Sequence, residues 1–426
     1  MNIDKTRAYI ERSRSSPLKI HIQLNKYKNT GYLDDALPLA IPHLRQLKSL
    51  TIYADVLPGP LKHFCCQTPL LEELDIHFRC SHGSTLDRTL FDGDLSSLRK
   101  LTLSGAIMIT HLPWNNMKNL QVFSLKSWSS VHSITQLLDF LESVPLLHTI
   151  KLNSVPDLSD APPQRMVCLS RLKALTIDTD LPHSILLNHV CIPTGASLIL
   201  RFYFSGQKSP LLDYLPEAPT DLKNLSHITT INLLFDSEEK FVRLSGPSGS
   251  LHLFAYWQNG ETDSHTVDRR ILHSLDPPTL STTQRLVISK YRHSYQAEGS
   301  PIFRCLSLMN SLRTLILTEC NNSPFILALD PEEHPSKLML CPNLEELVLY
   351  VALQDQFQGE QLISMAKNRA SGGVQISSIT IVGLGKLALV MQVPKLEKHV
   401  TCVTYRVDKA PPAWDHIPGE SGDKSK

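Results

Sequence analysis

Apolar residues recur along the chain with the spacing Leu-x-x-Leu-x-Leu, and polar or turn-forming residues separate most copies from the next. Neighbouring copies follow at steps of 22–32 residues, and two longer gaps leave room for two and three steps of similar length. A short motif repeated at such a period indicates a repeat architecture. The ten copies begin at Leu47, Leu71, Leu98, Leu120, Leu147, Leu172, Ile228, Leu312, Leu344 and Ile376.

Weaker copies fill the gaps and extend the pattern upstream. Strict alternation of apolar residues from Leu18 to Leu24 predicts one more strand. We call the three apolar residues of each copy its anchors. The last two anchors lie two residues apart, on one face of a short strand, and the first lies where the chain enters that strand. We therefore predict about fourteen units. The weaker copies are Leu198/Leu200, Leu251/Leu253 and Leu286/Ile288.

A single unit is too small to fold by itself. At ~1.5–3 kcal/mol per buried side chain, three anchors contribute roughly 5–8 kcal/mol. Ordering ~25 residues costs about 1.5 kcal/mol for each residue. Neighbouring units must therefore stack and complete one another's core, which places their strands side by side in one continuous parallel sheet.

Segments between the predicted strands have helical spacing, as in residues 134–141 and in residues 362–366, where Gly372 and Gly373 follow as a stop signal. The predicted fold class is α/β. It is a leucine-rich-repeat solenoid with a curved parallel sheet inside and helices and turns outside. The alternative is a non-repeat α/β fold in which the motif matches arise by chance.

The amino-acid composition limits the classes of function and location that we expect for this chain. The 42 basic residues are balanced by 41 acidic ones, so no basic stripe indicates nucleic acid as a partner. No apolar run is long enough for a membrane span, and the N-terminus lacks a signal-peptide core. Nine cysteines, odd in number and scattered, are typical of reduced thiols and packing residues in the cytoplasm or nucleus.

Catalytic and cofactor motifs are weak in this sequence. The densest group of soft metal ligands has no Cys-x-x-Cys pair, so we interpret it as packing and surface residues; it is His63, Cys65, Cys66, His77, Cys80 and His82. Gly383-Leu-Gly385-Lys386 lacks the spacing of a phosphate-binding loop. We predict no enzyme activity, no cofactor and no metal.

The residues that flank the buried pair of each strand should face away from the core and form a partner-binding surface. Its first half is polar and its second half contains an apolar strip. The proposed contact residues are Tyr53, Asp75, His77, Lys126, Lys151, Leu234, Ile316, Val348 and Tyr350. Two interpretations of the strip stay open. Either the chain's own loops or tail cover it, or it is a pocket for a partner with Tyr350 near its centre.

Several phrases resemble the leucine-rich-repeat region of F-box proteins from mushroom-forming fungi. A proline precedes the anchors in residues 68–74, 144–150 and 341–347, the chain closes with residues 403–415, and residues 12–22 look like the first strand of that region. In that family an F-box docks a Skp-type adaptor and a cullin ligase, while the repeats choose what is ubiquitinated. No F-box precedes residue 17, so we expect adaptor and cullin partners only if one is encoded upstream.

We expect residues 1–16 to be an N-terminal remnant or partial cap, and residues 17–398 to form the solenoid. Residues 399–415 should supply a capping strand, and residues 416–426 a disordered tail. Because little covers the first strand, we expect an unstable N-terminal end. The predicted function is non-catalytic protein binding that resembles substrate recognition in ubiquitin ligation. The alternatives are a free-standing repeat scaffold or sensor and, less favoured, an enzyme with an unrecognised site.

Overall fold

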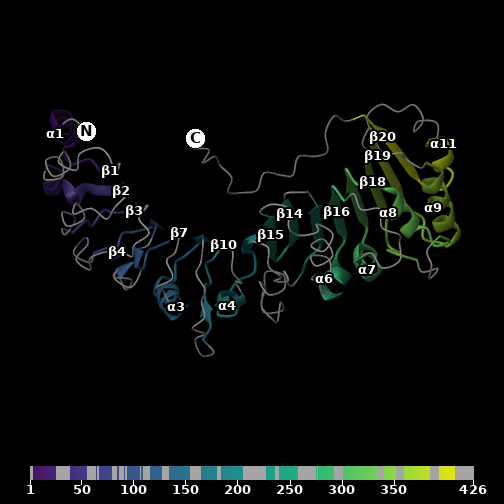
Figure 1. Ribbon diagram of the computed structural model, residues 1–426, viewed down its shortest axis with the longest axis horizontal. Helices are drawn as coiled ribbons and strands as arrows, with labels where there is room; N and C mark the ends of the chain where they lie inside the picture. Colours follow the sequence, from purple (N-terminus) through teal and green to yellow (C-terminus); the bar gives the residue numbers. More distant parts are fainter. Residues whose placement is uncertain are drawn as a thin grey trace. The chain divides into compact units, whose positions relative to one another are not determined.

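The computed structural model describes residues 3–24, 39–54, 64, 67–78, 84–85, 91, 94–105, 107–108, 116–126, 134–153, 165–179, 184–204, 227–235, 239–257, 275, 277–291, 301–333, 339–351, 359–383 and 393–407. It is an α/β fold built around one mostly parallel sheet of 16 strands (Figure 1). The predicted α/β class and the large parallel sheet are therefore confirmed.

A strand lies at each of the predicted positions, including the expected closing strand near residue 403. In order across the sheet the strands are β1 (Leu18–Leu24), β2 (Leu47–Ala54), β3 (Glu73–Phe78), β5 (Lys100–Ser104), β7 (Val122–Lys126), β8 (Thr149–Asn153), β10 (Ala174–Thr179), β12 (Ser197–Phe204), β15 (Gly249–Trp257), β14 (Glu239–Gly246), β13 (Thr230–Phe235), β16 (Arg285–Ser289), β17 (Thr314–Thr318), β18 (Glu346–Val351), β19 (Ser378–Gly383) and β20 (Cys402–Arg406). Two small parallel sheets pair β4 (Ser84–Thr85) with β6 (Ile107–Met108), and β9 (Val167–Cys168) with β11 (Val190–Cys191).

The apolar anchors align across neighbouring strands. Leu50 pairs with Leu74, and Leu74 pairs with Leu101, while the second anchor of each strand follows the same register. All of these side chains are buried. The same alignment holds from β16 to β19, where Leu315 pairs with Leu347. The motif therefore encodes one continuous apolar layer, because equal spacing within each copy puts equivalent side chains in register.

Backbone hydrogen bonds at the start of each strand fix this register. The amide of Gln121 donates to the carbonyl of Arg99 at 2.8 Å, and that of His148 donates to Gln121 at 2.8 Å. Side-chain amides reinforce the stacking on the loops: Asn119 Nδ2 donates to the carbonyl of Ser96 at 2.7 Å, as Asn343 Nδ2 does to that of Asn310. These bonds join neighbouring copies of the motif to one another along the sheet.

Helices precede many of the strands. They are α1 (Ile3–Ser13), the 3-10 helix η1 (Ile41–Gln46), α3 (Ile134–Ser143), α4 (Ser184–Leu187), α6 (Pro277–Thr282), α7 (Pro301–Leu308), α8 (Ser323–Leu329), α9 (Gly359–Ser371) and α11 (Val393–Leu396). The two helices expected from residues 134–141 and 362–366 are confirmed as α3 and α9. Gly373 follows α9 with φ +77°, a conformation that glycine adopts without steric cost.

The chain forms two compact units. Unit 1 comprises Met1–Ser226 and Ser248–Phe254, and unit 2 comprises His227–Pro247 and Ala255–Lys426. In unit 1, α3 and α4 lie on one side of the strands, and in unit 2, α6, α7 and α9 do so (Figure 1). In each unit the strand side chains that alternate with the anchors point away from these helices. We call that side the open face.

The prediction of a wholly parallel sheet in sequence order was wrong between residues 228 and 257. Strand β14 was not expected, and it runs antiparallel to β13. Only the two residues Pro247 and Ser248 separate β14 from β15. A connection that short joins antiparallel neighbours, whereas a parallel pair needs a crossover of a dozen or more residues. The strand containing Leu251 and Leu253 consequently lies next to β12, and β13 lies next to β16.

The first and last strands differ from the interior ones. Helix α1 precedes β1, yet its Tyr9 is 74% exposed, and Leu18 and Ile20 of β1 are only half-buried. At the other end, β20 pairs with β19 and its side chains are half-buried or exposed. Trp414 and the predicted tail at residues 416–426 lie outside the described residues. Within the described residues, no helix is long and apolar enough to cross a membrane.

Candidate functional site

The open face of unit 1 presents an array of mainly polar side chains on in-register strands. From β2 to β8 it consists of Ser49, Thr51, Tyr53, Glu73, Asp75, His77, Lys100, Thr102, Ser104, Val122, Ser124, Lys126, Thr149, Lys151 and Asn153. The central residues Thr102 and Ser124 are buried by their neighbours at 7% and 6% exposure. Because these side chains are held by the sheet, the surface is pre-ordered before any partner arrives.

Tyr53 lies at the centre of a ring cluster on this face. Its ring stacks on the imidazole of His77, with centroids 4.3 Å apart and planes 5° apart. On its other side, His21 of β1 lies 5.4 Å away in a tilted arrangement. Tyr53 is in register with His77, and His21 is in register with Thr51, so two strand pairings bring the three rings together. Tyr53 remains 39% exposed and presents an aromatic surface to solvent.

Carboxylates flank the ring cluster. Asp75 Oδ1 lies 2.6 Å from His77 Nε2, and both side chains are largely shielded. This oxygen is buried, and no aligned hydrogen-bond donor reaches it from the described part of the chain. Nearby, the hydroxyl of Ser49 donates to Glu73 Oε2 at 3.3 Å, and Glu72 pairs with Lys48 at 3.3 Å. The β2–β3 part of the face therefore joins an aromatic surface to hydrogen-bond acceptors.

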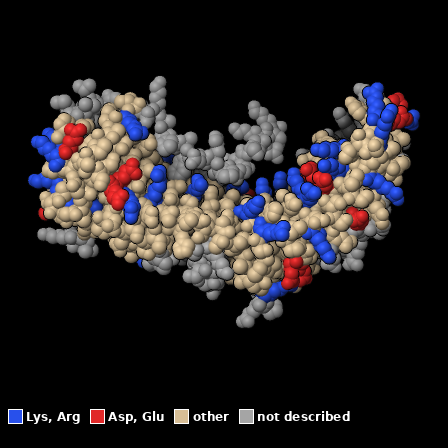
Figure 2. All heavy atoms as spheres, turned by 180° about the vertical axis from the view of Figure 1, so that it is seen from behind, with Lys and Arg blue, Asp and Glu red and all other residues tan. Residues whose placement is uncertain are grey.

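Each of the next three strands carries one lysine on the open face. Lys100, Lys126 and Lys151 occupy the open faces of β5, β7 and β8, which bear no carboxylate. Lys126 and Lys151 are diagonal neighbours, because Lys151 is in register with Ser124. Neither pairs with a carboxylate of a described residue, although Glu73 is in register with Lys100. On the side of the molecule shown in Figure 2, lysines and arginines lie among uncharged residues together with fewer acidic groups.

The apolar strip of unit 2 is not an open pocket. Ile316, Val348 and Val382 are 8%, 9% and 5% exposed and form a packed cluster, against which Val287 and Tyr350 pack partly buried. Beside it the hydroxyls of Ser289 and Thr318 hydrogen-bond to one another, and both residues are buried. Leu234 is half-buried. Neighbouring parallel strands are about 4.8 Å apart, so branched side chains in register cover one another.

The structure thus assembles only some of the predicted contact residues. Tyr53, Asp75 and His77 form one cluster, and Lys126 and Lys151 form a second, with β5 between the two. Sequence reasoning missed His21, although the alternation of residues 18–24 places it on the open face. It also had no means of showing that the strip in unit 2 would be closed, because the mutual covering of side chains depends on their packed positions.

A hollow that was not predicted lies at the N-terminal ends of β3, β5 and β7. It has a volume of about 300 Å³ and is lined by Leu70, Glu72, Ser97, Arg99, Asn119 and Gln121. Several of its polar groups already bond within the fold, since the Ser97 hydroxyl donates to the carbonyl of Pro69 at 2.5 Å. We interpret this hollow as a gap between stacked loops.

Metal-ligand geometry is not found in the described ranges, where no three histidine, cysteine or acidic side chains converge on one point. Of the cysteine and histidine group noted in the sequence, only His77 lies within those ranges. Comparison with known proteins adds no family: no protein-family model matches the chain, and no curated protein matches it.

Proposed function

We propose that this chain is a leucine-rich-repeat solenoid that binds another protein through the open face of unit 1 and performs no catalysis. The observation that carries the proposal is the stacked pair of Tyr53 and His77, which leaves Tyr53 partly exposed on a pre-ordered sheet that also carries carboxylates and lysines. Ten motif copies with aligned anchors, stacked by hydrogen bonds from copy to copy, support the repeat architecture.

The shape and chemistry of this face suit a macromolecule. Small-molecule sites are usually concave and mostly apolar, whereas this face is mainly polar and spread over the five strands from β2 to β8. Tyrosine anchors often carry a large share of the binding free energy at protein interfaces. Lysines at the edge of an interface mainly raise the association rate through electrostatic steering. We assign Tyr53 the anchoring role and Lys126 and Lys151 the steering role.

Substrate recognition in ubiquitin ligation is the specific role we favour, and it rests on the resemblance to the repeat region of fungal F-box proteins. A free-standing scaffold or sensor is the second candidate. The two differ in one observable. Co-purification of a Skp-type adaptor with the product of the full gene supports the first, and its absence from that product supports the second.

The test of the binding face is quantitative affinity purification followed by mass spectrometry. The wild type is compared with the double variant Tyr53→Ala/His77→Ala and with a control, Met166→Ala, whose side chain is 52% exposed and lies off the open face. We expect the control to recover the same partner as the wild type, and the double variant to recover at least about tenfold less, equivalent to about 1.4 kcal/mol. Equal recovery by all three folded proteins would exclude this face.

Charge reversal provides a second, independent readout. Lys126→Glu/Lys151→Glu should slow association with the partner found above and should weaken its dependence on salt concentration, since screening acts on steering charges. The dissociation rate should change much less. A variant that dissociates faster while associating at the normal rate would contradict the steering role and would place these lysines in direct contact with the partner.

A further inference from the structure

Two cysteines from separate parts of the sequence meet in the small sheet of β9 and β11. These strands pair in parallel outside the main sheet, with Val167 in register with Val190 and Cys168 in register with Cys191. The segment between the two cysteines contains the whole of β10. In the sequence these cysteines are only two of nine scattered ones, because strand pairing between β9 and β11 is a property of the tertiary structure.

The register gives the two thiols a geometry close to that of a disulfide. In-register residues of paired strands lie about 4.8 Å apart, and the Cα atoms of a disulfide lie ~4.4–6.8 Å apart. Both side chains point outward, because the flanking residues on each strand are buried and the cysteines are not. Cys168 is exposed and Cys191 is partly exposed. The buried flanking residues are Val167, Leu169, Val190 and Ile192.

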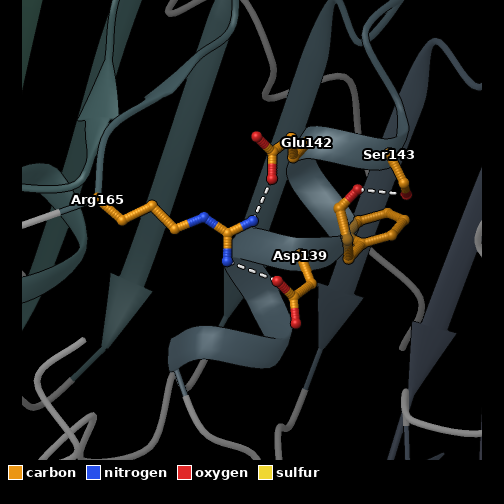
Figure 3. Close-up of polar contacts among 5 residues, drawn as sticks. Asp139, Glu142, Ser143 and Arg165 are labelled. Atoms are coloured by element: carbon orange, nitrogen blue, oxygen red, sulfur yellow. Dashed lines mark hydrogen bonds and ion pairs between the residues drawn. The ribbon is translucent and has the colours of Figure 1, made fainter. Parts of the chain in front are cut away.

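Polar contacts hold β9 and β11 in this register. The guanidinium of Arg165, just before β9, lies 2.5 Å from Asp139 Oδ1 of α3 and also bonds Glu142 one turn further on (Figure 3). The hydrogen bonds to Asp139 and Glu142 raise the pKa of Arg165, so it stays charged. His189 Nδ1 donates to the carbonyl of Arg165 at 2.9 Å, and the amide of Val167 donates to the carbonyl of His189 at 2.8 Å.

The other described cysteines lack this arrangement. Burial raises the pKa of the Cys305 and Cys341 thiols to about 12, so both stay protonated and shielded from solvent. Cys320 is buried as well. Cys402 is exposed on β20, but its in-register neighbour is Ser378. Among the residues that the structure describes, Cys168 and Cys191 are the one pair of cysteines in register on neighbouring strands.

We propose that Cys168 and Cys191 form a modification site at which a peroxide reversibly creates an intramolecular disulfide. The exposed Cys168 thiolate attacks one oxygen of hydrogen peroxide, the O–O bond breaks, and Cys168 sulfenic acid and water form after proton transfer. The sulfur of Cys191 then attacks the Cys168 sulfur, the S–O bond breaks, and a second water leaves. Overall, two thiols and one peroxide give one disulfide and two waters, and a dithiol reductant restores the starting state.

The experiment treats the purified full chain with stoichiometric hydrogen peroxide and maps disulfide-linked peptides by mass spectrometry, with and without dithiothreitol. We expect one dominant linked pair, Cys168 with Cys191, an intact mass lower by two hydrogen atoms, and full reversal by the reductant. Cys402→Ser is the matched control for an exposed thiol and should leave the linked pair unchanged.

Single variants separate the two steps. Cys191→Ser should accumulate a sulfenic acid at Cys168 that dimedone traps, and Cys168→Ser should show no such product at Cys191 at the same peroxide dose. The proposal is overturned if peroxide oxidises Cys168 and Cys402 to the same extent without a linked pair, or if the linked peptides join other cysteines. Each of these variants replaces sulfur by oxygen on an outward-pointing side chain, so folding is checked by circular dichroism before treatment.

Discussion

The phenol ring of Tyr53 lies parallel to the imidazole ring of His77, 4.3 Å from it between centroids, although 24 residues separate them in sequence. They meet because β2 and β3 pair in parallel with these two residues in register. The step between motif copies therefore sets which open-face side chains become neighbours. A copy shifted by one residue would turn Tyr53 into the core.

A double-mutant cycle should measure the interaction free energy between the rings of Tyr53 and His77. We expect Tyr53→Ala and His77→Ala to be coupled by about 0.5–1.5 kcal/mol, the usual range for a stacked aromatic pair. Tyr53→Phe should keep most of this coupling because it keeps the ring. Equilibrium urea denaturation of the four proteins gives the value. A coupling near zero would mean that the two rings are close without stabilising one another.

The buried anchors should contribute more to the free energy of unfolding than nearby exposed residues do. Leu175 is 2% exposed and packs in the aligned apolar layer, so Leu175→Ala should lower the free energy of unfolding by about 2–5 kcal/mol through lost burial and the cavity left behind. Lys173→Ala, two residues earlier and exposed, should change it by less than about 0.5 kcal/mol. Thermal and urea unfolding followed by circular dichroism would check both. Similar losses from the two variants would contradict the aligned core.

The antiparallel pairing of β14 with β13 depends on a glycine. A Cβ atom at Gly246 would lie 1.8 Å from the carbonyl oxygen of His227 and 3.2 Å from the Cα of Ile228, both of which are backbone atoms. Gly246→Ala should therefore displace β14 from β13 and cost more than about 2 kcal/mol. In Gly372→Ala the nearest atom is the flexible Cε of Met339 at 3.1 Å, so a much smaller loss is expected. Hydrogen exchange in residues 239–246 distinguishes the two variants.

Arg369 is a buried cation held by carbonyl groups. Its two terminal nitrogens donate to the carbonyls of Leu340 and Cys341, each at 2.9 Å, and burial lowers its pKa. Arg369→Met should remove the side-chain donor from both buried carbonyls, of which that of Cys341 keeps the amide of Leu344 at 3.1 Å, and should cost about 2–4 kcal/mol. Arg313→Met removes an exposed pair with Glu345 at 3.6 Å and should cost about 0–1 kcal/mol. Chemical denaturation of both variants provides the comparison, and equal costs would argue against the buried role.

The buried thiols of Cys305 and Cys341 predict a loss of stability at high pH. Their pKa values rise from 9.0 to about 12 on burial, so unfolded thiols ionise first as pH increases. The unfolded state then binds fewer protons than the folded state, and the free energy of unfolding must fall between about pH 9 and 12. Cys305→Ala/Cys341→Ala should flatten this part of the profile, measured by urea denaturation at each pH. An unchanged slope would contradict the assignment.

The sequence by itself determined where the strands of the large sheet lie, apart from β14, and which face of each strand is buried. Anchors such as Leu74, Leu101 and Leu347 could be predicted because a period of two within each strand fixes the face, and a recurring motif fixes the stacking partner. The same alternation placed Tyr53, His77 and Lys151 on the open face. These properties depend on the local sequence, so the spacing of apolar residues is enough to predict them.

Only the tertiary structure decided what depends on contacts between distant segments. The two-residue turn from β14 to β15 and the close backbone approach of Gly246 to His227, at the start of β13, leave no periodic signal in the sequence, so the antiparallel β14 could not be predicted. Contacts between strands likewise bury Ile316 and Val348. Pairing between β9 and β11 brings Cys168 into register with Cys191. A residue's own neighbours in sequence determine its face, but the residues that cover it or bond to it are supplied by other strands.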